Sequence, residues 1–254
     1  MTMSTIAAIR GLDVTPQKPQ VAANTDEHSG RTDLGVHEGD LPIGTVHRPS
    51  PLSPEERTTS MCGRFTFQPT EALYARFQIS NRLDSLVPLY NIASGQMVPV
   101  IIANSPRRVV LMRWGLIPHW AKDAKTAYKM INAWVETLTQ RPAFRGLLSH
   151  NRALVPACGY YEWQGAGQDK TPYYIHSRSE SFVAFAGLYD TWTTPDGDEL
   201  YTFTIITTDA DESMARLHNR MPVILAQELE EAWLDPELTK AQDALVLLSR
   251  SAGL

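Results

Sequence analysis

The pattern of apolar and polar positions divides the chain near residue 60. Residues 1–60 hold no Phe, Tyr or Trp but six of the 17 prolines, and every aromatic residue lies at or after Phe65. Such a stretch buries too little apolar surface to offset the entropy lost on ordering. We therefore expect residues 1–61 to be a disordered extension, or sequence upstream of the true start, that is removed before the protein acts.

Beyond residue 61, apolar residues recur at the spacings of short helices and of many strands. Helical spacing is found over 69–78, 137–148 and 229–248. Runs rich in β-branched and aromatic residues predict strands over 96–103, 107–114, 153–163, 172–176, 182–189 and 200–207. This pattern favours one α+β domain over residues 62–254, built as an antiparallel twisted sheet or open barrel with peripheral helices.

Charge and cysteine content narrow the classes of function. Residues 1–60 carry 5 basic and 8 acidic side chains, and the remainder carries 18 and 20, so the folded part is close to neutral. Contact with nucleic acid must then come from a local patch rather than from a global field. The two cysteines form no CxxC pair, which argues against a disulfide framework or a cysteine zinc site.

No stretch approaches the ~18 apolar residues that a membrane span needs. The apolar run at 6–9 is also too short for a secretory signal, which needs about 7–15 such residues. We expect a soluble protein of a reducing intracellular compartment.

The cysteine that follows Met61 has unusual chemical potential. If the chain began at Cys62, this residue would carry an α-amine, with a pKa of about 7.7–8.0, beside a thiol. Together these two nucleophiles can close a five-membered ring on an aldehyde, which an internal cysteine cannot do. Gly63 permits close approach and Arg64 can hold a phosphate. A single cysteine is nevertheless more often a small buried hydrophobe, and we interpret Cys158 in that way.

Glu162 lies within a run of aromatic residues, Tyr160-Tyr161-Glu162-Trp163. A carboxyl group buried there would have a raised pKa, which suits a general acid or a proton shuttle. The alternative is a structural carboxylate paired with an arginine.

Two further segments carry polar chemistry. His218 could act as an acid or base near neutrality, although a lone histidine is more often structural. Arg220 beside it could bind an anion, and Asn132 could position an amine or an oxyanion.

The motifs occur in one order: Met61-Cys62-Gly63-Arg64-Phe65, Tyr90-Asn91-Ile92-Ala93, Arg113-Trp114-Gly115-Leu116-Ile117-Pro118, Ile131-Asn132-Ala133, Glu162-Trp163 and His218-Asn219-Arg220-Met221-Pro222. From Met61 to about Trp233 the chain resembles the SRAP family, the SOS-response-associated peptidases understood as abasic-site processing proteins. The resemblance implies covalent linkage to abasic sites in single-stranded DNA, through a Schiff base and then a thiazolidine on Cys62. It also implies a monomer without metal or cofactor, in the cytoplasm and associated with the nucleoid when bound to DNA.

The resemblance implies a role for each matched residue. Asn132 would hold the reacting amine or sugar oxygen, Glu162 would move protons, and His218 would polarise the sugar hydroxyl or the imine. The resemblance implies that Arg64 and Arg220 hold backbone phosphates and that Trp120, with Asn91 near the pocket, stacks on or beside a base. Trp134 is the fifth predicted DNA contact, at a position where this chain departs from the family.

The sequence departs from the family at three places. Trp134 stands where members usually have Arg, so that stacking replaces charge or DNA binding is weakened. The chain ends at Leu254, before the C-terminal strand that members usually carry, which we expect to leave a sheet edge uncovered. The extension blocks the α-amine of Cys62, unless translation begins at Met61 or the protein cleaves its own Met61–Cys62 bond as an autopeptidase. We favour translation from Met61, because the composition of residues 1–60 is not that of a folded segment.

Two other functions remain open from the sequence. A cysteine peptidase would use Cys62 as nucleophile with His218 and Glu162 as base and orienting group, and it would work with an internal cysteine. A non-covalent single-stranded DNA-binding module would bind reversibly and form no adduct.

Overall fold

The structure is a computed structural model that describes residues 12–16, 63–103, 106–165 and 170–252. Cys62 and most of the predicted extension lie outside the described residues. Leu12–Pro16, however, form strand β1, so the expectation of an extension without regular structure does not hold for these five residues. Within the described residues, no helix is long and apolar enough to cross a membrane.

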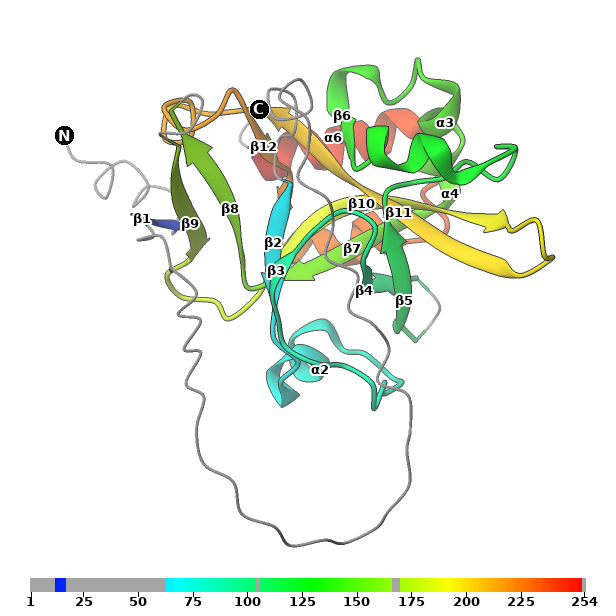
Figure 1. Ribbon diagram of the computed structural model, residues 1–254, viewed down its shortest axis with the longest axis horizontal. Coiled ribbons are helices and arrows are strands. Elements are labelled where there is room, and N and C mark those ends of the chain that lie inside the picture. Colours follow the sequence, from blue (N-terminus) through cyan, green and yellow to red (C-terminus); the bar gives the residue numbers. More distant parts are fainter. Residues whose placement is uncertain (1–11, 17–62, 104–105, 166–169, 253–254) are drawn as a thin grey trace, which may run out of the picture. The chain divides into compact units, whose positions relative to one another are not determined.

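A closed ring of five strands lies at the centre of the described fold (Figure 1), in the order β11–β5–β4–β7–β10 with β10 pairing back to β11. The ring strands are β4 (Met97–Ile102), β5 (Arg108–Trp114), β7 (Arg152–Ala157), β10 (Val183–Thr193) and β11 (Glu199–Asp209). Short strands extend it, with β6 (Asn132–Trp134) and β12 (Arg220–Pro222) on β11 and β13 (Ile224–Leu225) on β10. The α+β prediction is confirmed, but the ring is closed, and β11 pairs in parallel with β5 and β6.

A second, antiparallel sheet has the order β1–β9–β8–β2–β3. Its strands are β1 (Leu12–Pro16), β2 (Arg64–Phe67), β3 (Leu89–Ile92), β8 (Gly159–Gln164) and β9 (Thr171–Ser177). The β2–β8 register sets Arg64 across from Tyr161. The strand that follows Cys62 in sequence therefore lies beside the strand that carries Glu162.

The chain passes from the ring to the second sheet at Cys158. The sequence predicts one strand over 153–163, whereas the structure has β7 and β8 on either side of this residue. A Cβ on Gly159 would lie 2.5 Å from the Ile175 carbonyl oxygen, so only glycine permits this close approach. Cys158 donates its backbone N–H to the Thr66 carbonyl at 2.9 Å and is half-buried rather than fully buried.

Aromatic side chains join the two sheets. The Phe65 ring on β2 packs edge-on against Trp114 at 5.1 Å and against Phe185 at 6.0 Å between ring centroids. Tyr160 on β8 meets the same Phe185 ring at 5.8 Å. The Trp114 indole N–H donates to the carbonyl of Ile131 at 2.9 Å. One aromatic cluster thus fixes the positions of β2, β8 and the segment that leads into Asn132.

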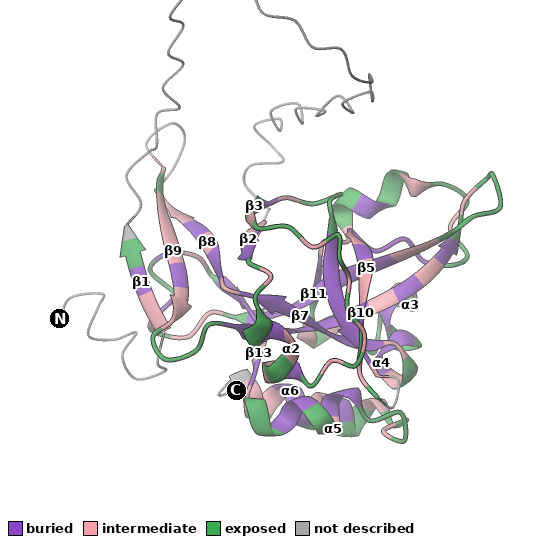
Figure 2. Cartoon of the chain, turned by 90° about the horizontal axis from the view of Figure 1, so that it is seen from below, coloured by how far each residue is buried: buried purple, intermediate pink, exposed green. Residues whose placement is uncertain are grey.

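Short helices accompany the strands, and Figure 2 shows that α5 and α6 combine buried and exposed residues. They are α2 (Glu71–Phe77), α3 (Pro142–Arg145), α4 (Leu147–His150), α5 (Glu230–Leu234) and α6 (Ala241–Ala252), with 3-10 turns η3 (Ala124–Lys129), η4 (Val135–Thr137) and η5 (Gln227–Leu229). The helix predicted over 69–78 is confirmed. The helix predicted over 229–248 is interrupted, because Pro236 lies two residues after the end of α5 and cannot continue the helix. Helix α5 contacts β7, and α6 contacts β13.

Candidate reactive site and nucleic-acid interface

Two predicted DNA contacts meet at the start of β2. The Arg64 guanidinium donates to the side-chain oxygen of Asn91 on β3 at 3.1 Å. Asn91 is exposed and Arg64 partly exposed, so both are accessible to a ligand. Cys62, two residues before Arg64, lies outside the described residues. The structure therefore places the neighbours of the predicted nucleophile but not the nucleophile itself.

Asn132 and Glu162 are buried polar residues, 8% and 2% exposed respectively. Asn132 lies on β6, where parallel pairing sets it across from Ile205 of β11. Glu162 lies on β8, across from Tyr173 of β9. Burying an amide or a carboxyl group is costly unless polar partners compensate. Their burial at strand positions is consistent with a site that withholds them from bulk water.

His218 is held in one orientation by the chain that follows it. Its Nδ1 accepts the backbone N–H of Arg220 at 3.1 Å, so the neutral ring carries its proton on Nε2. Burial lowers the pKa of the imidazole below its usual value, and the positive charges of Lys170 and Arg220 lower this pKa further. His218 is therefore a neutral hydrogen-bond donor through Nε2 at physiological pH.

Arg220 is already engaged by carboxylates. Its guanidinium forms a bidentate pair with Glu136 at 2.8 and 2.9 Å, and it contacts Asp209 at 2.7 Å and the Thr207 carbonyl at 2.7 Å. The Arg220 side chain is only 6% exposed, whereas Glu136 and Asp209 are 44% and 78% exposed. Burial opposes the charge, but the two carboxylates outweigh it and raise the pKa of Arg220. With one cation and two anions, the cluster carries one net negative charge.

Trp134 covers the same guanidinium from another side. The Arg220 carbon Cζ lies 5.0 Å from the centre of the Trp134 ring, a cation–π contact. The indole remains 47% exposed. A large flat side chain that is held by a buried arginine and still reaches solvent is suited to stacking on a nucleobase.

One contact connects the strand of Glu162 to the turn of His218. The Gln164 side-chain amide donates to the carbonyl of Arg216 at 3.2 Å. Gln164 lies two residues after Glu162, and Arg216 two residues before His218. These two predicted catalytic residues are therefore brought to adjoining segments, although they are 56 positions apart in the sequence.

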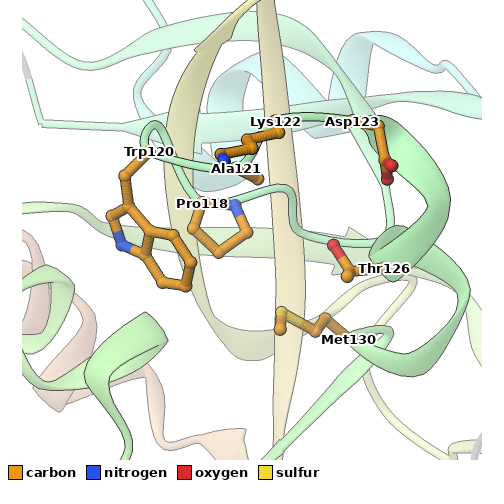
Figure 3. A pocket seen from close by; sticks show the side chains of 7 residues that line it. All are labelled: Pro118, Trp120, Ala121, Lys122, Asp123, Thr126 and Met130. Atoms are coloured by element: carbon orange, nitrogen blue, oxygen red, sulfur yellow. The ribbon is translucent and has the colours of Figure 1, made fainter.

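Trp120 lies elsewhere, in a loop that β10 holds in place. His119 donates its backbone N–H to the Asp190 carboxylate at 2.8 Å. Trp120 is 59% exposed and lines a cavity of about 170 Å³. Figure 3 shows it beside Pro118. The cavity is lined by Pro118, Trp120, Ala121, Lys122, Asp123, Thr126 and Met130. Within the described part of the chain, no other predicted site residue lines it.

The sequence did not identify the partners of Arg220. Glu136 and Asp209 lie 84 and 11 positions from it, and no local spacing connects either carboxylate to the arginine. The one available signal was the rule that a buried arginine needs a counter-charge. That rule predicts the existence of a carboxylate but not its position.

Fold and site together define a class of protein: an α+β domain on a closed ring of strands, in which the strand that follows Cys62 pairs with the strand that carries the buried Glu162. The model of the SOS response associated peptidase (SRAP) family matches residues 61–253, and this chain belongs to that family. Its family membership, as predicted, is therefore confirmed.

Named relatives and solved structures agree with this assignment. The abasic site processing protein YoqW of Bacillus subtilis is 47% identical over 184 residues, covering 70% of this chain and 82% of YoqW. The abasic site processing protein HMCES of Gallus gallus is 35% identical over 194 residues, covering 63% and 58%. A crystal structure of a Bacteroides thetaiotaomicron protein superposes with a TM-score of 0.66 at 33% identity, covering 73% of this chain and 86% of that one.

Proposed function

We propose that this protein processes abasic sites in single-stranded DNA by linking Cys62 to them covalently. The single observation that carries the proposal is the β2–β8 register. Because Arg64 lies across from Tyr161, continuing this antiparallel pairing by one residue sets buried Glu162 across from Gly63. Gly63 directly follows Cys62. The names of the relatives, abasic site processing proteins, support the same substrate.

The proposed reaction has two bond-forming steps and no redox change. The Cys62 α-amine attacks the aldehyde carbon of the opened deoxyribose, and loss of water gives a Schiff base. The Cys62 thiol then adds to the imine carbon, and its proton ends on the nitrogen. The product is a thiazolidine, which only a cysteine with a free α-amine can form.

The surrounding residues orient groups and move protons in this scheme. Asn132 holds the reacting amine or the sugar oxygen. Glu162 transfers protons during ring opening and closure. His218 donates from Nε2 to the sugar hydroxyl or the imine, which its fixed and neutral ring supports.

DNA is held at separate places. Arg64, with Asn91, contacts a phosphate beside the reactive end of β2. Trp134 stacks on a base with its outer face, while Trp120 provides a second flat surface on its loop. Arg220 serves as a phosphate ligand only where a phosphate competes with Glu136. We expect modest affinity for intact DNA, a monomer, and a cytoplasmic protein that associates with the nucleoid on DNA.

The Cys62 amine must first be exposed. Translation from Met61 followed by methionine removal would achieve this, and so would cleavage of the Met61–Cys62 bond by the protein itself. Strand β1 favours the second route, because it makes residues 12–16 part of the folded protein. Mass spectrometry of protein from its native cell distinguishes the routes by whether a 1–61 fragment is produced.

The test is adduct formation by residues 62–254 with an abasic single-stranded oligonucleotide, read on a denaturing gel. We expect an adduct that survives heat and detergent, disappears in Cys62→Ala and persists in the matched control Cys158→Ala. Reversible binding without an adduct would instead support a non-covalent module. Peptide cleavage by the uncut chain, with Cys62 still internal, would support a cysteine peptidase.

A further inference from the structure

We infer that the outer edge of β9 is a strand-acceptor site, which Leu12–Pro16 occupy in the intact chain and leave once the chain is cut before Cys62. The pairing itself is independent of the proposed function. Only the cut rests on it, because that function requires a free Cys62 amine.

The first support is the pairing. Strand β1 runs antiparallel to β9, with Leu12 across from Ser177 and Pro16 across from Tyr173 (Figure 1). The other edge of β9 is taken by β8. Without β1, the outer edge would present a row of unpaired backbone N–H and C=O groups, which is a template for another strand.

The second support is that the side chains of β1 match the surface on which they lie. Val14 is 8% exposed and belongs to the main hydrophobic core, and Leu12 packs against that core from the same face of the strand. On the opposite face, Asp13 lies 3.9 Å from His176 and 4.0 Å from Arg178. Apolar residues therefore face the core, while the acidic residue faces basic ones.

The third support concerns what happens on cleavage. Forty-five residues, 17–61, separate Pro16 from Cys62. While the chain is intact, this covalent connection keeps β1 near the edge of β9 at an effective concentration on the order of millimolar. After a cut, the segment becomes a separate molecule at its bulk concentration. At roughly micromolar protein, the odds of occupancy fall about 1,000-fold, and a strand of five residues has little else to hold it.

The edge also lies close to the proposed site. Pro16 pairs with Tyr173, and Tyr173 pairs with Glu162. The end of β1 is thus two strands from Glu162, roughly 10 Å at the usual strand spacing. The extension therefore blocks the Cys62 amine and also covers the neighbouring sheet edge, and one cut removes both.

The test compares hydrogen exchange of the β9 backbone in three full-length chains that all carry Cys62→Ala. Val14→Asp places a charge at the buried position, and Thr15→Asp makes the same addition at its exposed neighbour. The reference is the chain that carries Cys62→Ala alone. Relative to it, we expect the β9 backbone to exchange at least 10-fold faster in Val14→Asp and at the same rate in Thr15→Asp. Exchange of β7 serves as a check that the domain remains folded. Unchanged protection in Val14→Asp would overturn the pairing.

Release is tested by inserting a site-specific protease site between residues 17 and 61. After cutting at micromolar concentration, we expect the N-terminal fragment to separate on gel filtration and β9 exchange to rise to the Val14→Asp rate. A fragment that elutes with the domain would overturn release. Because Cys62 is absent throughout, these outcomes do not depend on DNA chemistry, which the adduct assay tests separately.

Discussion

The carboxylates around Arg220 lead to a quantitative prediction for DNA binding. Glu136→Gln keeps the shape of the side chain but removes one negative charge from a cluster that holds one cation and two anions. The cluster then becomes neutral, and one side of the Arg220 guanidinium loses its strongest competitor. We expect tighter binding of intact single-stranded DNA, which is the opposite of what removing a DNA contact would give.

Coulomb's law gives the size of this effect. A phosphate about 6 Å from the Glu136 carboxylate would be repelled by about 1 kcal/mol at an effective dielectric constant between roughly 40 and 80. Removing that repulsion strengthens binding about 5-fold. If Arg220 gains one phosphate contact, the slope of log K against the logarithm of salt concentration becomes steeper by about 0.7. The loss of fold stability is about 1 kcal/mol at most, because Glu136 is 44% exposed.

Fluorescence anisotropy of a labelled intact oligonucleotide, titrated at several salt concentrations, measures both quantities. The matched control is Glu199→Gln, the same charge change at an exposed residue at the opposite end of β11 from Asp209. The two ends are ten residue-to-residue steps apart, or roughly 33 Å. Equal affinities for wild type, Glu136→Gln and Glu199→Gln would refute the idea that Arg220 meets DNA.

Three further predictions concern other parts of the structure. Trp134→Ala should weaken binding of the same oligonucleotide by about 1–3 kcal/mol, and Trp134→Phe should retain most of it; equal losses would exclude stacking. Because burial lowers the pKa of His218 below 6.5, the unfolded chain takes up the proton first as pH falls. The stability of wild type relative to His218→Asn, measured by urea denaturation, should therefore be constant above pH 6.5 and decline below pH 6.5. A relative stability that increases below pH 6.5 would contradict a lowered pKa of His218. Glu230→Ala removes the partner of the mostly buried Arg76 and should cost about 3 kcal/mol, or roughly 6–12 °C in melting temperature. Glu71→Ala, in an exposed ion pair, should barely change the melting temperature.

Local sequence patterns predicted individual helices and strands, but they did not predict which distant strands pair. The helix at α2 and most strands could be located, because period-3.6 and period-2 spacing acts over a few residues. The closure of the ring could not, since it depends on β11 pairing with β10 on one side and in parallel with β5 on the other. No property of the segment at 199–209 alone indicates either neighbour.

Strand β1 shows a different reason for failure. Composition averaged over residues 1–60 indicates too little apolar surface for a core, and that inference concerns independent folding. Leu12 and Val14 do not need a core of their own, because β9 and the existing core supply one. A short alternating segment can therefore gain order from an edge that only the folded domain provides.

At the candidate site, the motifs predicted buried polar residues, while the structure revealed how charge is distributed among them. Family resemblance expects Arg at position 134, and a second guanidinium there would lie beside the buried Arg220. In this chain the position holds Trp134, which covers Arg220, and Glu136 and Asp209 neutralise it. Because two carboxylates and an indole surround the buried Arg220, we expect DNA binding at this proposed contact to depend on stacking more than on charge. The salt dependence of DNA binding should accordingly be shallow in the wild type and steeper only when Glu136 is neutralised.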